Sequence, residues 1–301
     1  MRRLAPLART LALSLAIAPC VLAPQASVHA APASQSPAAA ATEAAPATPT
    51  PAAAATESAR EAAMAGYLYF YPLVVMDLTR RQFTHPAQGS PGAPSNTFAH
   101  VRTLPRAGEA TPWSNFDVLR STAWLDLTDG PVVLSTPDTS GRRYTLTLLD
   151  MWTDVFATLG TRTTGTAKGN TAIVPPGWTG TLPSGMARID APTAHVWAKV
   201  LIDTRGGADQ ATVNALQDGF AVTPLAQWNL PAQAPRPKPD PSLDLKIPAS
   251  EQVDAMPTDA FFTYAAELLR KHPPHATDQP VLVLLPRVGL APGRPFDFDK
   301  L

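Results

Sequence analysis

The sequence predicts a mainly β protein of the α+β class, in which an N-terminal helix precedes an antiparallel β-sandwich-like body. An apolar stretch with helical spacing comes first, over residues 56–83. Short segments of alternating hydrophobicity begin near residue 115, and glycine, proline and Asp-Gly turns separate them. This spacing is typical of a sheet or sandwich and not of alternating β and α units.

Composition limits the classes of protein to consider. The chain has 301 residues with 45% hydrophobic content, enough for one large domain or two small ones. Lys+Arg and Asp+Glu are both 24, so the formal net charge is zero, and no basic stripe indicates a nucleic-acid partner.

The first 30 residues resemble a secretory signal peptide. Three arginines precede an apolar stretch over residues 10–23, and Val28-His29-Ala30 is a small-residue cleavage site. A membrane anchor is the alternative, but the apolar run is short and interrupted by proline. We therefore expect a periplasmic or secreted protein with no membrane span. Cleavage would remove Cys20, the only cysteine, and leave no disulfide.

Four segments are expected along the chain. The signal peptide over 1–30 is followed by a disordered Ala/Pro-rich linker over 31–55. A folded body should occupy 56–230, and 231–301 should hold a linker, a helix and the start of a truncated C-terminal region.

Within the body, the helix over 56–83 should begin at Thr56, and Pro72 should kink it or split it in two. A second, short helix is expected over 206–220, and a third after Thr258 as its N-cap. Strands are expected at residues 121–127, 131–137, 144–152, 170–176 and 194–203.

The strand over 144–152 raises a chemical question. Tyr144, Leu146 and Leu148 share one face, and Asp150 and Trp152 continue it. A carboxylate on an apolar face is costly unless it is paired.

The residues after this strand suggest a partner for Asp150. Arg162 follows a turn expected near Gly160, and Thr164 belongs to a threonine cluster that offers hydroxyl groups. We expect Asp150 and Arg162 to pair beneath a pocket floor with Trp152 packed over them. The alternative is that Arg162 grips an anionic ligand.

Asn115 and Asp117 are two residues apart, so a strand would place both on one face. An amide beside a carboxylate can bind a hydroxyl-rich ligand, or it can order a turn. Together with Asp150, Trp152, Arg162 and Thr164, these two complete the set of ligand-binding candidates.

Common motifs for nucleophilic, nucleotide and zinc chemistry are absent from the sequence, so no catalytic residue is assigned. We expect no metal and no cofactor. His272 and His275 form an H-x-x-H pair with Asp278 nearby, and we interpret this stretch as a solvated loop because prolines separate the two histidines.

The order of several motifs resembles the family called domain of unknown function 1254. The matching stretches include "YLYFYPLVVMDLTRRQ", "NTFAHVRTLP", "NFDVLRSTAWLDLTDGPVVLSTPDTSGRRYTLTLLDMWTDVFATLGTRTTGT", "AIVPPGWTGTLPSG" and "LQDGFAVTPL". The resemblance covers roughly residues 60–230. It implies an exported bacterial protein with a sandwich-like body, and it implies no reaction.

Two departures from the family pattern are visible. The family's Asn-x-Asp-Thr-Leu-Tyr is matched at Asn115 and Asp117, but Val118 and Arg120 replace the threonine and tyrosine. The partner region, domain of unknown function 1214, would begin about where this chain stops, so we expect it to be missing.

Two functions follow as hypotheses. The first is a protein that binds a small polar ligand and acts as a hydrolase, with Asp117, Asp150 and Asp154 available for acid/base work. The second is a non-catalytic structural or binding module. The apolar stretch "VLVLLPRVGL" near the C-terminus also suggests association with a second copy of the chain.

Overall fold

The computed structural model describes residues 51–87, 92–106, 108, 115–231 and 239–300. The description below concerns the compact unit within Pro49–Leu301. The predicted signal peptide and most of the predicted linker lie outside the described residues.

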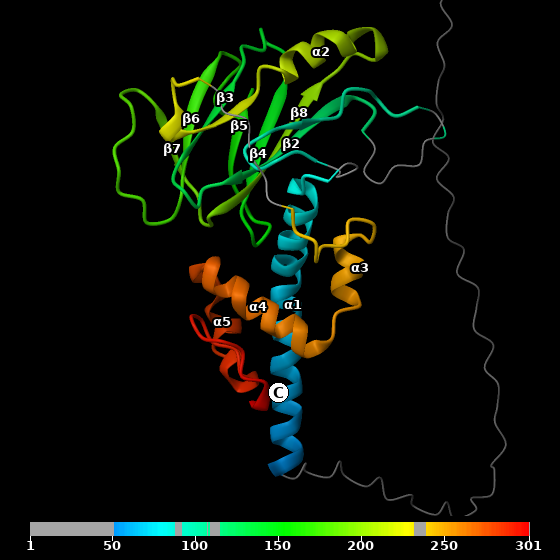
Figure 1. Cartoon of the computed structure of the whole chain (residues 1–301), viewed down its shortest axis with the longest axis vertical. Helices are drawn as coiled ribbons and strands as arrows, with labels where there is room; N and C mark the ends of the chain where they lie inside the picture. The colour runs from blue at the N-terminus through cyan, green and yellow to red at the C-terminus, as the bar shows by residue number, and fades with distance from the viewer. Residues whose placement is uncertain (1–50, 88–91, 107, 109–114, 232–238, 301) are drawn as a thin grey trace, which may run out of the picture. The chain divides into compact units, whose positions relative to one another are not determined.

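The fold is α+β, as predicted, with an N-terminal helix before two mostly antiparallel sheets (Figure 1). The helices are α1 (Pro51–Thr84), α2 (Gln210–Gln217), α3 (Ala249–Asp254), α4 (Thr258–Lys271) and α5 (Gln279–Leu282). The strands are β1 (Ala99–His100), β2 (Val118–Asp126), β3 (Val132–Thr136), β4 (Tyr144–Leu149), β5 (Val155–Gly160), β6 (Gly169–Val174), β7 (Ala187–Asp190), β8 (His195–Asp203) and β9 (Ala221–Pro224).

The strands form a sandwich. One sheet has the order β1-β2-β8-β4-β5 and is antiparallel throughout, and the other has the order β7-β6-β3-β9 with one parallel pair, β6 and β7. The alternating pattern of β4 buries Tyr144, Leu146 and Leu148 in the core between the sheets, as predicted. The opposite face of the larger sheet carries Trp124 and Trp197, whose rings stack at 5.5 Å.

The helices build a second core. The apolar faces of α1, α3, α4 and the turn Leu285–Val288 pack together, and Met151 and Trp152 reach this core from the sandwich. Helix α1 is one uninterrupted helix through Pro72, so of the two predicted outcomes, a kink or a split, the split is wrong and the kink stays a prediction. Tertiary packing on both sides of Pro72, with Phe70, Leu73 and Val74 fully buried, holds the helix together.

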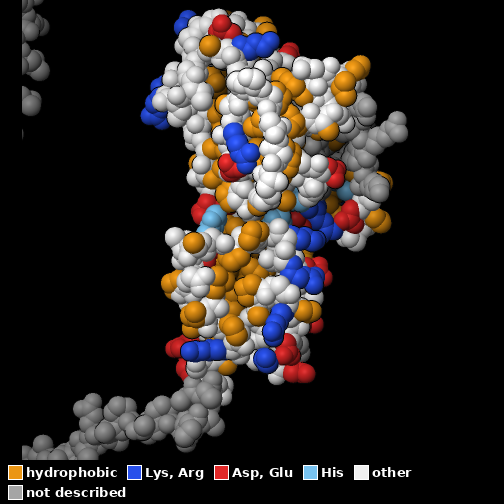
Figure 2. All heavy atoms as spheres, turned by 90° about the vertical axis from the view of Figure 1, so that its left-hand side faces the viewer, with side chains coloured by type: hydrophobic (Ala, Val, Ile, Leu, Met, Phe, Trp, Pro, Cys, Tyr) orange, Lys and Arg blue, Asp and Glu red, His pale blue; other side chains and the backbone are white. Residues whose placement is uncertain are grey.

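The apolar C-terminal stretch is covered within this core. Leu285, Val288 and Leu290 are fully buried, although Val283 is exposed. Figure 2 shows hydrophobic side chains gathered over the helical part of one face, with histidines near the level of the sandwich. Association of two copies stays a prediction, but these three side chains are not free to drive it.

Helix α1 also bears on the membrane question. Thr56–Thr84 is long and apolar enough to cross a membrane by length and composition. Buried core helices satisfy the same test, and 44% of its most apolar stretch is buried within the structure. The expected absence of a membrane span therefore stays a prediction.

Several element boundaries differ from the sequence prediction. Helix α1 begins at Pro51, within the stretch predicted as a linker, and not at Thr56. The strand predicted over 144–152 ends at Leu149, because Asp150 begins a tight turn into β5. Thr258 is the first residue of α4, and Pro257 occupies the N-cap position instead. Proline at that position supplies no side-chain hydrogen bond to the helix.

Candidate functional site

The turn between β4 and β5 is organised by the carboxylate of Asp150. Its Oδ1 accepts hydrogen bonds from the backbone N–H groups of Trp152 at 2.9 Å and Asp154 at 3.1 Å. The Asp150 N–H donates to the carbonyl of Asp154 at 3.0 Å. Thr153 lies between them with a φ of 75°, which is a strained conformation for a β-branched residue. The turn therefore holds its shape through Asp150, whose side chain is fully buried.

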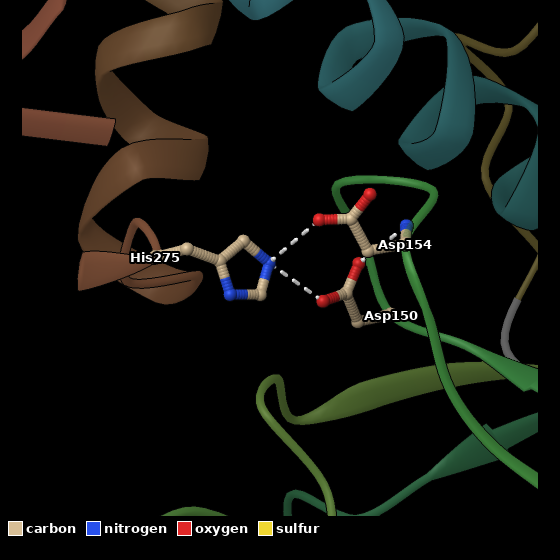
Figure 3. Close-up of side chains that lie close together, drawn as sticks. All are labelled: Asp150, Asp154 and His275. Atoms are coloured by element: carbon tan, nitrogen blue, oxygen red, sulfur yellow. Dashed lines mark hydrogen bonds and ion pairs between the residues drawn. The ribbon is translucent and has the colours of Figure 1, made fainter. Parts of the chain in front are cut away.

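His275 faces this turn from the segment that follows α4 (Figure 3). Its Nε2 lies 2.8 Å from Oδ2 of Asp150 and 3.5 Å from Oδ2 of Asp154. The close pair is at ion-pair distance but is not aligned as a hydrogen bond, so both atoms are buried without a hydrogen-bond partner. Asp154 is the outer member of the group, with 72% of its side chain exposed.

The electrostatics of Asp150 are dominated by burial. Burial raises the pKa of Asp150 above its ordinary value, although the N–H of Asp154 and the charge of His275 act in the opposite direction. Within the described part of the chain, no lysine or arginine lies within ion-pair distance of Asp150 or Asp154. Their negative charge is thus balanced by His275 alone, and only when its imidazole is protonated.

Several contacts fix the two segments that carry this group. The indole Nε1 of Trp152 donates to the carbonyl of Pro273 at 3.0 Å, and the Trp152 ring packs 4.7 Å from that of Tyr69. The carboxylate of Asp278 accepts two hydrogen bonds, one from the hydroxyl group of Tyr69 at 2.8 Å and one from the backbone N–H of His275 at 2.9 Å. The sandwich turn, α1 and the segment after α4 therefore meet in one hydrogen-bonded junction.

An open cavity of about 570 Å³ adjoins the same segment after α4. It brings together segments that are distant in sequence. Its lining consists of residues 127–130, residues 175–178, Ala194, Lys271 and Pro273. Its wall combines an apolar surface of Trp178 and three prolines with the charged groups of Asp129 and Lys271. Such a mixture of ring surface and few charged groups is typical of a site for a small polar molecule.

Two histidines with little exposed surface are chain neighbours of residues that line this cavity, since His195 follows Ala194 and His272 follows Lys271. His272 and His195 are in ring contact at 5.6 Å, and the Nδ1 atom of each is buried without a hydrogen-bond partner. Burial is the main reason that the pKa of each is lowered to about 4, so both rings are neutral at pH 7. The two histidines of the H-x-x-H motif thus face different neighbours, because His275 faces Asp150.

The predicted pairing of Asp150 with Arg162 is wrong. Strand register places Thr145 opposite Gly160, while Leu149 lies opposite Val155. Arg162 is exposed beyond the far end of β5, and the length of β4 separates it from Asp150. The turn expected near Gly160 is present, but a tight turn at Asp150–Asp154 already reverses the chain before it, so the partner of Asp150 comes from a distant segment.

The other candidates divide between the two ends of the larger sheet. The hydroxyl oxygen of Thr164 accepts a hydrogen bond of 3.0 Å from the backbone N–H of Gly160 and so orders the turn after β5. Asn115 and Asp117 precede β2, and the carbonyl of Asp117 accepts the N–H of Thr204. These three lie at the end opposite Asp150 and Trp152, as the pairing of Val118 with Asp203 shows.

None of the six candidates lines the cavity, and their role in ligand binding stays a prediction. Of the three carboxylates considered for acid/base work, the structure brings Asp150 and Asp154 together and places Asp117 elsewhere. His275 and Lys271 were not among the candidates. The H-x-x-H spacing was the only sequence signal for His275. Because we interpreted this stretch as a solvated loop, we did not predict the contact of His275 with Asp150.

Comparison with known proteins supports the family resemblance. Residues 95–224 match the model of the family described as protein of unknown function (DUF1254). The crystal structure of the VPA0106 protein from Vibrio parahaemolyticus has a similar fold, with a TM-score of 0.57 and 20% sequence identity. The similarity covers 80% of this chain and 55% of that one. No curated protein matches the chain. The absence of a 1214 partner region stays a prediction.

Proposed function

Residues 95–224 belong to the family of unknown function 1254, which assigns no reaction, and we propose the function from the geometry. The protein is exported, and its folded body binds a small polar ligand in the cavity beside Trp178 and Lys271. The observation that carries this proposal is the cavity of about 570 Å³, which joins an indole, a carboxylate and an ammonium group from three separate segments.

The lining of the cavity suits a ring-bearing ligand with hydroxyl or acidic groups. The half-buried indole of Trp178 and the neighbouring prolines offer flat apolar surface for a ring. Asp129 can accept hydrogen bonds from hydroxyl groups, and the exposed ammonium group of Lys271 can bind a carboxylate or phosphate.

Trp178 is held in place before any ligand arrives. The guanidinium of Arg188 lies 5.5 Å from the centre of its ring, and Arg188 also donates to the carbonyl of Trp178 at 3.4 Å. Arg188 is itself anchored by the carboxylate of Asp190. A fixed aromatic wall favours binding, because less side-chain freedom is lost when the ligand stacks on it.

Export is supported by the sequence of the first 30 residues and by the chemistry of the body. The basic end, the apolar stretch and the cleavage site follow the order of a secretory signal. No cysteine occurs after Cys20, so the folded body needs no particular redox compartment.

A thermal-shift screen of the purified protein against a library of small metabolites tests ligand binding, because a ligand of the native state raises its melting temperature. Lys271→Met and Asp129→Asn should reduce the shift given by a ligand of this cavity. Lys168→Met is the matched control, since Lys168 is exposed just before β6, at the end of that strand away from the cavity. An equal loss in the control would contradict the placement.

The same ligand decides between the two hypotheses on activity. Incubation with the protein followed by mass spectrometry separates a hydrolase, which would add water to the ligand and release products, from a non-catalytic binding module, which would return it unchanged.

A further inference from the structure

We propose that Asp150, Asp154 and His275 bind one divalent transition-metal ion at the junction between the sandwich and the helices. The ligand atoms are one oxygen of each carboxylate and Nε2 of the imidazole. This site is separate from the ligand cavity, and the proposal does not depend on the proposed function.

The distances suit a shared cation. All three ligand atoms lie within 4.8 Å of one another, with Nε2 at 2.8 Å and 3.5 Å from the two oxygens. Neighbouring ligands of an ion with bonds near 2.1 Å are roughly 3.0 Å apart in octahedral geometry and roughly 3.4 Å apart in tetrahedral geometry. The two distances from Nε2 bracket these values, and the exposed side chain of Asp154 is free to move its oxygen to a similar distance from that of Asp150.

Two buried atoms in the group lack the partner that burial requires. Oδ2 of Asp150 belongs to a side chain with no exposed surface, and it accepts no hydrogen bond. Nε2 of His275 faces it and is equally without a hydrogen-bond partner. Buried polar atoms of this kind are costly. A cation between them would satisfy both at once and would balance the charge of two carboxylates.

The surrounding contacts orient the ligands in the way metal sites require. The two backbone N–H groups on Oδ1 of Asp150 leave Oδ2 free and aim it at His275. The hydrogen bond from the His275 N–H to Asp278, and that from Trp152 to Pro273, fix the facing segment. The ligands therefore come from two segments that are already held together.

The ligand types select the class of ion. Imidazole nitrogen with carboxylate oxygen suits Zn²⁺ and Mn²⁺, whereas Ca²⁺ and Mg²⁺ prefer oxygen alone, and no thiolate is present to favour softer ions. Three protein ligands leave one or more positions for water, and the exposed side of Asp154 gives solvent access to them. Zn²⁺ is therefore the probe of choice.

Isothermal titration calorimetry with Zn²⁺ tests the site, using purified protein freed of metal by EDTA and dialysis. We expect one equivalent to bind and to raise the melting temperature. Asp154→Asn and His275→Gln should each weaken binding at least tenfold, since even residues that only support a ligand contribute that much. Mg²⁺ should bind more weakly than Zn²⁺.

The variants are chosen so that folding does not confuse the result. Asp154 is exposed, so its replacement leaves the core intact, whereas Asp150 holds the turn and is left unchanged. Asp117→Asn and His85→Gln are matched controls outside the site, and circular dichroism verifies that all four variants fold. Zn²⁺ binding that is absent, or equally strong in the site variants and the controls, would overturn the proposal and leave a structural His–Asp pair.

Discussion

Replacement of His272 by glutamine should make the protein less sensitive to mild acid. His272 is 1% exposed and contacts His195, and the pKa of each is lowered from 6.5 to about 4. The unfolded chain binds a proton on each ring near pH 6.5, and the folded protein does so only near pH 4. Between these values the unfolded state binds more protons, so stability falls as the pH falls through this window.

The size of the effect follows from the two pKa values. For one histidine with these values, the linkage relation gives a loss of about 2 kcal/mol in unfolding free energy between pH 7 and pH 5. The charge of His195 lowers the pKa of His272, so the folded protein does not readily bind protons on both rings, and the pair together loses up to about twice this amount.

Charged groups from three elements face the pair. Arg80 and Asp77 come from α1, Asp126 comes from β2, and Lys271 ends α4. The two carboxylates raise the pKa values of the histidines, and the two cations lower them. Burial is the largest cause for both histidines, and it lowers their pKa values because it disfavours the charged imidazolium.

Urea unfolding followed by tryptophan fluorescence, at pH 5 to 7.5 with EDTA present, measures the difference. The stability of the His272→Gln variant should fall about 2 kcal/mol less than that of the wild type from pH 7 to pH 5. His85→Gln serves as the control and should keep the wild-type slope. Parallel curves for wild type and His272→Gln would refute the reasoning, since they would mean that the buried ring does not stay neutral in the folded state.

Three further outcomes are expected. Gly160→Ala should destabilise the fold by about 2 kcal/mol or more in urea unfolding, because φ is 136° there and a Cβ atom would meet the carbonyl oxygen of Tyr144 at 2.4 Å; an unchanged midpoint would contradict this. A double-mutant cycle with Asp150→Asn and Arg162→Met should be additive within about 0.5 kcal/mol, because opposite ends of β4 separate the two residues, and a larger coupling would restore the pairing. N-terminal sequencing of the exported protein should begin at or near Ala31, and an intact Met1 would argue against cleavage.

Local patterns determined much of the fold. The alternation of Tyr144, Leu146 and Leu148 predicted a strand with one buried face, and the structure buries all three. The spacing of apolar residues and the Asp-Gly turn similarly predicted the strands on either side of Asp129. These features follow from sequence because the period of side chains along a strand and the conformations of turn residues are properties of neighbouring residues.

The candidate site was only partly visible in the sequence. The sequence predicted that the carboxylate of Asp150 is buried and needs a partner. It did not predict that this carboxylate organises a tight turn. The strand was extended to Trp152, so the tight turn at Asp150–Asp154 was missed, and Arg162, beyond the turn at Gly160, was taken as the partner. A shift of three residues in a strand end was enough to select the wrong partner.

Only the tertiary structure decided that His275 faces Asp150. The two residues are 125 positions apart, and they meet because Trp152 leaves the sandwich, packs on Tyr69 and donates its indole N–H to Pro273. Sequence periodicity specifies which face of an element is apolar. Which other element covers this face depends on the packing of the whole chain. The chemistry at the junction is set by that packing, because it brings two carboxylates and an imidazole within reach of one another.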